Sequence, residues 1–209
     1  MEPTQVHLDA RQIRVLAHPL RSRLLGRLRM DGPATATRLA EALGTNTGAT
    51  SYHLRQLADV GLVAEDDSAG RGRERWWRAA HDMSSWQRDA FAGDSDATAA
   101  ADWLDSYALR RFVARAESWQ RARPDAPPAW RIAAGFSDYF LHLGTEQLRA
   151  LTAELDTVIE RYRALGQTDP GPDARQVLLY LYAIPRLADP ADDPLAGETP
   201  TGGPEEARP

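Results

Sequence analysis

The fold is decided by residues 39–63, which read LAEALGTNTGATSYHLRQLADVGLV. Apolar residues recur at helical spacing on both sides of Gly44, and glycine suits the position just after a helix. The pattern predicts a helix that begins near Thr35 and ends at Gly44, followed by a helix over about 47–60. Because the small side chain of Ala40 permits close packing, the stretch predicts a helix-turn-helix pair.

Two further helices are expected before this pair, and a hairpin after it. Residues 9–17 and 19–30 carry apolar side chains at helical spacing, and a proline stands in the first turn of the second segment. Residues 62–65 and 73–79 flank a Gly-rich turn, which is typical of a β-hairpin. Together these elements predict a winged helix-turn-helix; a small α+β domain whose helix pair merely packs is the alternative.

Several strings in residues 9–80 resemble the arsenic-repressor (ArsR) type of winged-helix transcription regulator. They are PLR at 19–21 with Leu24 and Leu25, LAEALG at 39–44, SYHLRQLADVGLV at 51–63 and GRGRER at 70–75. The resemblance implies a dimeric, DNA-binding regulator whose fourth helix enters the major groove. The founding metal sensors carry a cysteine-containing motif on the preceding helix, and residues 35–41 contain no thiol. Thiolate metal sensing is therefore not carried over.

Composition excludes several classes of protein. The chain has 209 residues, of which 43% are hydrophobic and 26% charged, as is ordinary for a globular protein. It has no cysteine, which excludes disulfides, thiolate metal sites and cysteine nucleophiles. No stretch approaches about 18 consecutive apolar residues, and the start lacks a signal-peptide pattern. We therefore expect a cytoplasmic protein with no membrane partner.

The net charge of −5 is divided unevenly along the chain. Residues 1–80 hold 12 arginines against 9 acids, a net charge of +3, while residues 81–209 hold 13 against 21, a net charge of −8. The basic N-terminal part is where a polyanion such as double-stranded DNA would bind.

The polar face of the helix over about 47–60 carries the predicted DNA contacts. Arg55 can bind guanine O6 and N7 with two hydrogen bonds, and Gln56 can bind adenine N6 and N7 in the same way. Thr47 and Thr50 lie near the helix N-terminus, where free backbone N–H groups favour a phosphate. The same set includes Ser51, Tyr52 and His53. The alternative is an ordinary solvated polar face.

His53 has two interpretations of equal weight. It precedes Leu54 on the packed side of the helix, so it is either a half-buried structural histidine or a phosphate contact. On the helix over 19–30, Arg21 is the best candidate for a further contact to the DNA backbone, because it lies near the helix N-terminus.

The predicted wing turn spans residues 66–75 and carries Arg71, Arg73 and Arg75. An arginine on a hairpin tip can enter a narrow minor groove, where the negative potential is enhanced. The alternative is a solubilising loop. Because side chains alternate along a strand, one of the two tryptophans at 76 and 77 is expected to anchor the wing to the domain.

Three regions are expected overall: a winged helix-turn-helix domain over 9–80, a dimerisation or effector domain over 81–188, and a disordered tail over 189–209. The fold class is mainly α (α+β). Helices are expected over 97–122 and 145–165 and a strand over 176–184, while 139–143 fits a strand or a helix end.

The helix over 97–122 has a long apolar stripe, which predicts packing across a two-fold axis. The aromatic side chains of residues 86–182 are expected to form a core and dimer interface, with a pocket for a small apolar effector as the alternative.

No catalytic, nucleotide-binding or metal-binding motif is present, so we expect no cofactor and no enzyme activity. The leading hypothesis is a homodimeric regulator of transcription that binds a palindromic operator, with repression favoured. Two alternatives stay open: a protein-interaction module that uses the winged helix as a scaffold, and an enzyme with an accessory winged helix.

Overall fold

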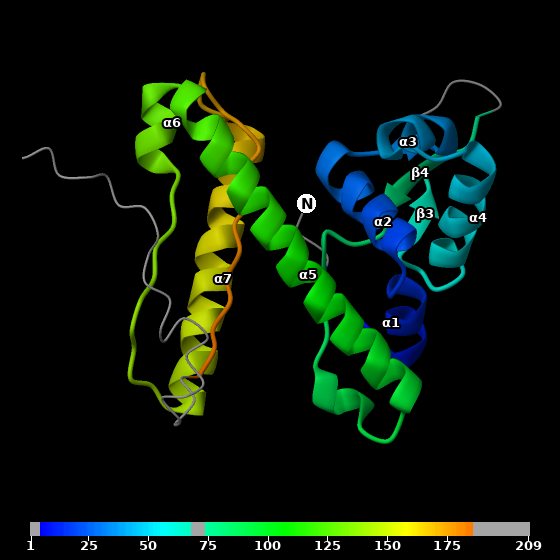
Figure 1. Ribbon diagram of the computed structural model, residues 1–209, viewed down its shortest axis with the longest axis horizontal. Coiled ribbons are helices and arrows are strands. Elements are labelled where there is room, and N and C mark those ends of the chain that lie inside the picture. The colour runs from blue at the N-terminus through cyan, green and yellow to red at the C-terminus, as the bar shows by residue number, and fades with distance from the viewer. Residues whose placement is uncertain (1–4, 68–73, 186–209) are drawn as a thin grey trace, which may run out of the picture. The chain divides into compact units, whose positions relative to one another are not determined.

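The computed structural model describes residues 5–67 and 74–185, and the chain divides into two units, residues 1–171 and 172–209. The expectation of a mainly α fold with a small β component is confirmed (Figure 1). In chain order the described elements are β1 (Gln5–His7), α1 (Ala10–Leu16), α2 (Pro19–Asp31), β2 (Ala34–Thr35), α3 (Ala36–Leu43), α4 (Thr47–Ala58), β3 (Val63–Glu65), β4 (Trp76–Ala79), β5 (Met83–Ser85), the 3-10 helix η1 (Arg88–Phe91), α5 (Ser95–Ala122), the 3-10 helix η2 (Arg123–Asp125), α6 (Pro128–Ala133) and α7 (Thr145–Thr168).

Helices α3 and α4 form the helix-turn-helix pair, and short polar side chains fix where each begins. The Thr35 hydroxyl accepts a hydrogen bond from the Arg38 backbone N–H, and the Asn46 side chain accepts one from the Ala49 backbone N–H at 2.8 Å. Gly44 ends α3 at φ 64°, in the left-handed region that glycine adopts without steric cost. The turn is therefore short, and the predicted positions of both helices are confirmed.

A three-stranded antiparallel sheet in the order β2-β4-β3 forms the wing side of the domain. Ala34 pairs with Trp77, and Val63 pairs with Ala79 across the hairpin. The predicted hairpin is therefore present, with β3 and β4 as its strands. A second, parallel pair joins β1 to β5. Neither β1, β2 nor β5 was predicted, because strands of two or three residues are too short to display alternation.

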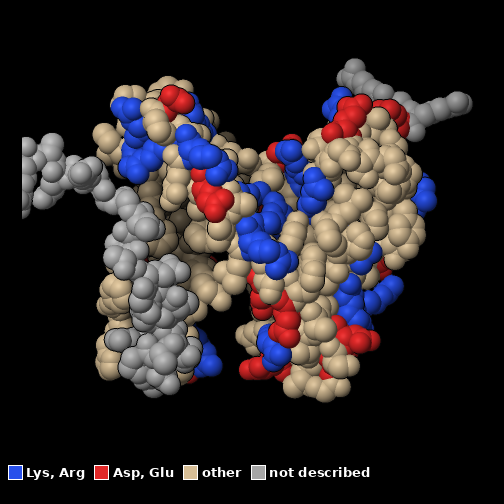
Figure 2. All heavy atoms as spheres, viewed as in Figure 1, with Lys and Arg blue, Asp and Glu red and all other residues tan. Residues whose placement is uncertain are grey.

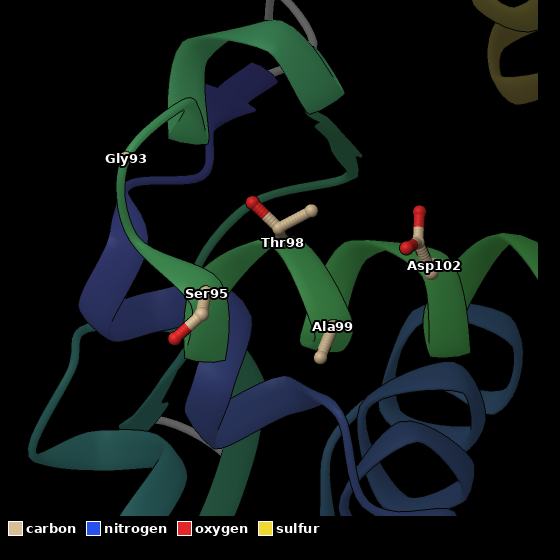
Figure 3. A pocket seen from close by; sticks show the side chains of 5 residues that line it. All are labelled: Gly93, Ser95, Thr98, Ala99 and Asp102. Atoms are coloured by element: carbon tan, nitrogen blue, oxygen red, sulfur yellow. The ribbon is translucent and has the colours of Figure 1, made fainter.

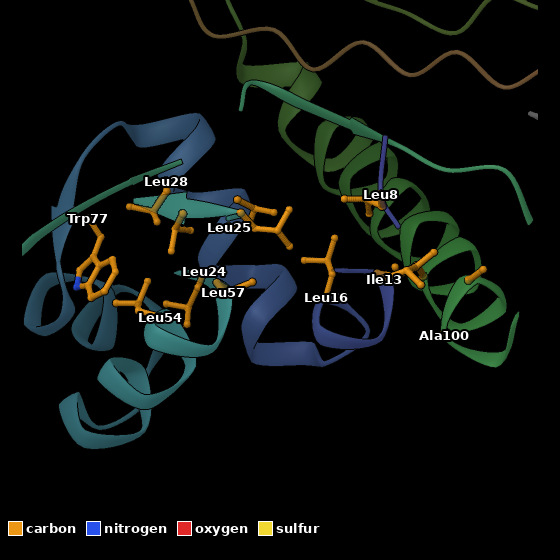
Figure 4. Close-up of a cluster of buried hydrophobic side chains, with 14 of the residues drawn as sticks. Leu8, Ile13, Leu16, Leu24, Leu25, Leu28, Leu54, Leu57, Trp77 and Ala100 are labelled. Carbon is orange, nitrogen blue, oxygen red and sulfur yellow. The ribbon is translucent and has the colours of Figure 1, made fainter. Parts of the chain in front are cut away.

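One apolar core joins α1, α2, α4 and the first half of α5 (Figure 4). Its fully buried members include Ile13, Leu24, Leu54, Leu57 and Leu62. Helix α5 adds Ala97, Ala100, Ala101 and Leu104, whereas further along the same helix Leu109 and Val113 are 43% and 50% exposed. The core thus extends past residue 80, and the division into regions at 80/81 stays a prediction.

Of the elements predicted after residue 96, the helices are confirmed and the strand is wrong. Helices α5 and α7 confirm the predicted helices, whereas residues 139–143 form no regular element. The predicted strand over 176–184 is wrong, because this segment belongs to neither described sheet. Its apolar side chains, such as Val177 and Tyr182, are 64% and 71% exposed. An apolar run becomes a β-strand only where a neighbouring strand accepts and donates its backbone hydrogen bonds. The predicted tail over 189–209 lies outside the described residues.

Among the described residues, no helix combines the length and the apolar character that crossing a membrane demands.

Candidate nucleic-acid interface

Helix α4 buries one face in the core and presents the other to solvent. Leu54 and Leu57 are fully buried, whereas Tyr52 is 55% exposed. The remaining predicted side chains of the solvent face are exposed at Thr47 and Arg55 and half-buried at Ser51 and Gln56. The helix therefore brings a tyrosine, an arginine, an amide and two hydroxyls together on one accessible surface.

Thr50 requires a correction. Its side chain is fully buried, and its hydroxyl oxygen has no hydrogen-bond partner. Thr50 lies on the side of α4 that also carries the buried Leu54 and Leu57, so a phosphate cannot reach it. The sequence predicted a phosphate contact because Thr50 is near the N-terminus of α4. Its position around the helix axis decides instead that the side chain is buried.

The side chain of His53 lies against α2. Its ring centroid is 4.5 Å from that of His18, the residue before α2, and 5.2 Å from that of Tyr52. Burial is the main cause of a lowered pKa at His53, followed by the nearby His18 and Arg21. This geometry matches the half-buried interpretation of His53, whereas a phosphate contact stays a prediction. No spacing in the sequence points to His18 as a neighbour of His53.

The arginines of α2 have different surroundings. Arg21 donates a hydrogen bond from Nε to the Val15 carbonyl, and burial lowers its pKa. Arg29 donates to the His81 carbonyl at 2.9 Å and to the Ser84 hydroxyl at 2.7 Å, and burial lowers its pKa to about 10. Arg29 therefore ties α2 to the segment after the hairpin. A DNA contact from Arg21 stays a prediction.

A hollow of about 290 Å³ lies between α3, α4 and the wing strand β4. Its lining residues are Thr35, Ala36, Thr37, Ser51, Arg55, Glu74, Arg75 and Trp77. Two arginines, Arg55 from α4 and Arg75 from the start of the wing, line it together with the Thr37 and Ser51 side chains. Cationic and hydroxyl groups can together hold an anion, and Glu74 limits the net charge there. Thr37 and Glu74 gave no sequence signal, because only the fold places them beside α4.

Arg75 and the two tryptophans fix the described part of the wing. Arg75 Nη1 lies 3.2 Å from Glu65 Oε1, and its guanidinium lies 5.7 Å from the Trp77 ring centroid. Trp77 is 4% exposed, which confirms that one of the two tryptophans anchors the wing. Arg38 of α3 lies over the Trp76 ring at 4.8 Å. Arg71 and Arg73 lie outside the described residues.

Charges of both signs occur on the surface. On the face shown in Figure 2, arginine and carboxylate side chains are interspersed. The charge excess of residues 1–80 is small, so the local placement of Arg55 and Arg75 matters more for binding a polyanion than the total does.

A second hollow, of about 450 Å³, lies at the N-terminal end of α5 (Figure 3). Its lining residues are Gly93, Ser95, Thr98, Ala99 and Asp102. Arg88 Nη2 binds the Asp102 carboxylate at 3.1 Å, and this hydrogen bond is the main cause of a lowered Asp102 pKa. Within residues 5–67 and 74–185, no three metal-ligating side chains come together.

The aromatic side chains after α6 are open to solvent. Phe136, Tyr139 and Phe140 are 84%, 80% and 94% exposed. Within this single chain these three side chains therefore form neither the expected aromatic core nor an enclosed pocket for an apolar effector.

Comparison with known proteins agrees with this geometry. Residues 16–66 match the family model described as a helix-turn-helix domain. The HTH-type transcriptional regulator NmtR of Mycobacterium tuberculosis (strain ATCC 25618 / H37Rv) is 45% identical over 62 residues, which are 30% of this chain and 50% of NmtR. The chain thus spans about half the length of this curated relative.

Two solved structures are similar in part. One is the homodimeric winged helix-turn-helix DNA-binding domain of a possible ArsR-family transcriptional regulator from Mycobacterium bovis, with 24% identity, a TM-score of 0.32, and coverage of 51% of this chain and 77% of that one. The other is a mutant of ZitR from Lactococcus lactis in apo form, with 13% identity, a TM-score of 0.28, and coverage of 68% and 83%. The helix pair, the hairpin and the matched residues 16–66 support one conclusion. The N-terminal part of this chain contains a winged helix-turn-helix, and its residues 16–66 are similar to a helix-turn-helix domain.

Proposed function

We propose that this protein regulates transcription by binding a palindromic DNA operator as a homodimer, with α4 in the major groove. The observation that carries the proposal is the solvent face of α4, which presents Tyr52, Arg55 and Gln56 beside a hollow shared with the wing. A helix with such a face fits the major groove of B-form DNA.

Each group on this face has an expected partner on DNA. Arg55 binds the O6 and N7 atoms of a guanine, and Gln56 binds an adenine. Thr47 stands at the first turn of α4, where its hydroxyl and the free backbone N–H groups receive a phosphate. The hollow between α4 and β4 receives the sugar–phosphate backbone, with Arg75 exchanging Glu65 for a phosphate oxygen.

The wing is proposed to enter the minor groove through Arg71 and Arg73, two arginines at its Gly-rich turn. These contacts add attraction that does not depend on sequence, whereas α4 reads the bases.

Dimerisation is proposed to involve the second half of α5. Leu109 and Val113 expose apolar surface there, and burying it against a second copy is favourable. Two copies place two α4 helices on two half-sites, which accounts for a palindromic operator. An apolar effector held by the exposed aromatic residues would need a second protomer to enclose it.

Repression is the favoured outcome, because a dimer on an operator excludes other proteins from the same DNA. A regulator of this kind works where the chromosome lies, so a cytoplasmic location stays a prediction.

Selection of bound duplexes from a random pool tests the proposal. The full chain should enrich an inverted repeat whose half-site centres are about 10 base pairs, or a multiple of that, apart. The variant Arg55→Ala with Gln56→Ala should lose the preference at two positions of each half-site, while Arg149→Ala on the exposed surface of α7 should not. No enrichment with the unaltered chain would favour the protein-interaction module.

A further inference from the structure

Two histidines from different helices lie ring to ring beside the proposed DNA-reading surface. The centroids of His18 and His53 are 4.5 Å apart, and the ring planes are inclined by 37°. His18 precedes α2 and caps it, because its Nδ1 accepts a hydrogen bond from the Leu20 backbone N–H at 3.1 Å. An acceptor nitrogen carries no proton, so this cap requires His18 to be unprotonated at Nδ1.

His53 connects that cap to the solvent face of α4. Its ring lies edge-on to the exposed Tyr52 ring at 5.2 Å, while its own Nδ1 is buried and has no hydrogen-bond partner. A proton on this nitrogen would create a buried N–H without an acceptor, which is unfavourable. The start of α2, the His53 ring and Tyr52 therefore form one continuous contact between α2 and α4.

Two further groups lie near the rings: Arg21 of α2, whose charge acts on both histidines, and Tyr52 of α4, whose ring contacts His53. Burial lowers the pKa of His18, and Arg21 lowers it further. Burial also lowers the pKa of His53, with His18 and Arg21 adding to the effect. The folded protein thus binds these protons less tightly than the unfolded chain. The neutral pair's contribution to stability is present above the ordinary value of 6.5 and is lost as the pH falls below it.

We propose that the neutral His18–His53 pair positions α4 for DNA, and that protonation of the pair weakens DNA binding. The inference rests on the proposed function. His18 and His53 act here as positioning residues: they touch α2 and Tyr52, and their effect on DNA passes through the orientation of α4.

Fluorescence anisotropy with the full chain and a labelled duplex of the enriched sequence tests this inference. Affinity is measured at about pH 8 and about pH 5.5 at constant ionic strength, on either side of the ordinary histidine pKa. The unaltered protein should bind DNA at least about fivefold more weakly at the lower pH. A factor of about five is the lower end of the range by which binding at one site usually changes affinity at another.

Two matched substitutions remove the titration while keeping the contacts. His18→Asn retains an oxygen that can cap α2, and His53→Phe retains an aromatic ring against residue 18. The double variant should lose most of the pH dependence, so that its affinity at about pH 8 and at about pH 5.5 is nearly the same. His142→Gln, at an exposed position outside the domain, should keep the dependence of the unaltered protein.

The outcomes separate this inference from the proposed function. Absence of DNA binding even at about pH 8 would overturn both. Binding at about pH 8 with an affinity that stays constant or rises toward about pH 5.5 would overturn the role of the pair alone. A pH dependence that the double variant keeps in full, with a native circular dichroism spectrum, would also overturn it.

Discussion

The guanidinium of Arg111 lies over Gly26: its Nη1 is 3.3 Å from the position that a β-carbon of residue 26 would occupy. Gly26 is in the interior of α2, and Arg111 is in α5 beyond the part of that helix that joins the core. The guanidinium also lies 5.7 Å from the ring centroid of Tyr107, which is stacked on Trp103. Because residue 26 is glycine and has no β-carbon, the Arg111 side chain of α5 has room to pack on α2.

This contact predicts energetic coupling between the two residues. Gly26→Ala gains up to about 1 kcal/mol of helix propensity, but in the unaltered background the new methyl group displaces the Arg111 guanidinium. The substitution should therefore stabilise the Arg111→Ala background more than the unaltered protein. Urea unfolding of the four proteins measures the difference. Equal gains in both backgrounds would show that the guanidinium does not pack at Gly26.

The threonines at the start of α4 should behave in opposite ways. Thr50→Val removes a buried hydroxyl without a partner, so the free energy of unfolding should rise by about 1 kcal/mol while DNA affinity stays constant. Thr47→Val removes an exposed hydroxyl and should weaken DNA binding by about 1 kcal/mol with little change in stability. A loss of DNA affinity in Thr50→Val would contradict this expectation and would support a phosphate contact by Thr50.

Arg55 should determine one base pair of each half-site. Arg55→Ala should cost roughly 1–3 kcal/mol on the preferred duplex and much less on duplexes altered at that base pair. Competition binding with single-position variants of the duplex measures this difference. Uniform weakening on every duplex would identify Arg55 as a phosphate contact within the hollow instead.

The wing arginines should control the salt dependence. Each neutralised phosphate contributes about −0.9 to the slope of log affinity against log salt, so Arg71→Ala with Arg73→Ala should flatten it by roughly 2 per protomer. Arg149→Ala with Arg161→Ala, two exposed arginines of α7, serves as the matched control. A flattening well below about 1 with unchanged affinity would leave the wing outside the minor groove.

The helix-turn-helix was predictable because its signals are local. Thr35 and Gly44 mark the two ends of α3 through a cap hydrogen bond and a left-handed φ, and both depend on residue type alone. The strands β1 and β2 were missed because long-range pairing, with β5 and β4 respectively, is what creates them.

The site was predictable only in part. The solvent face of α4 follows from helical spacing, but the burial of Thr50 depends on how neighbouring elements cover the other side of α4. The contact of His53 with His18 joins residues that are far apart in the chain, so spacing gave no sign of it. The apolar run at 176–184 shows the opposite error, since composition suggested a strand where no neighbouring strand exists in the described residues.

The absence of cysteine allows the central claim, that α4 lies in the major groove, to be tested with a single new thiol. Tyr52→Cys on the solvent face of α4 is labelled with an iron chelate that cleaves nearby DNA, and Arg149→Cys on α7 is the control. On the enriched duplex we expect two cleavage sites about one helical turn apart from the α4 position, and little from the control. Cleavage without preferred positions, or stronger cleavage from the α7 position, would contradict the placement of α4 in the major groove.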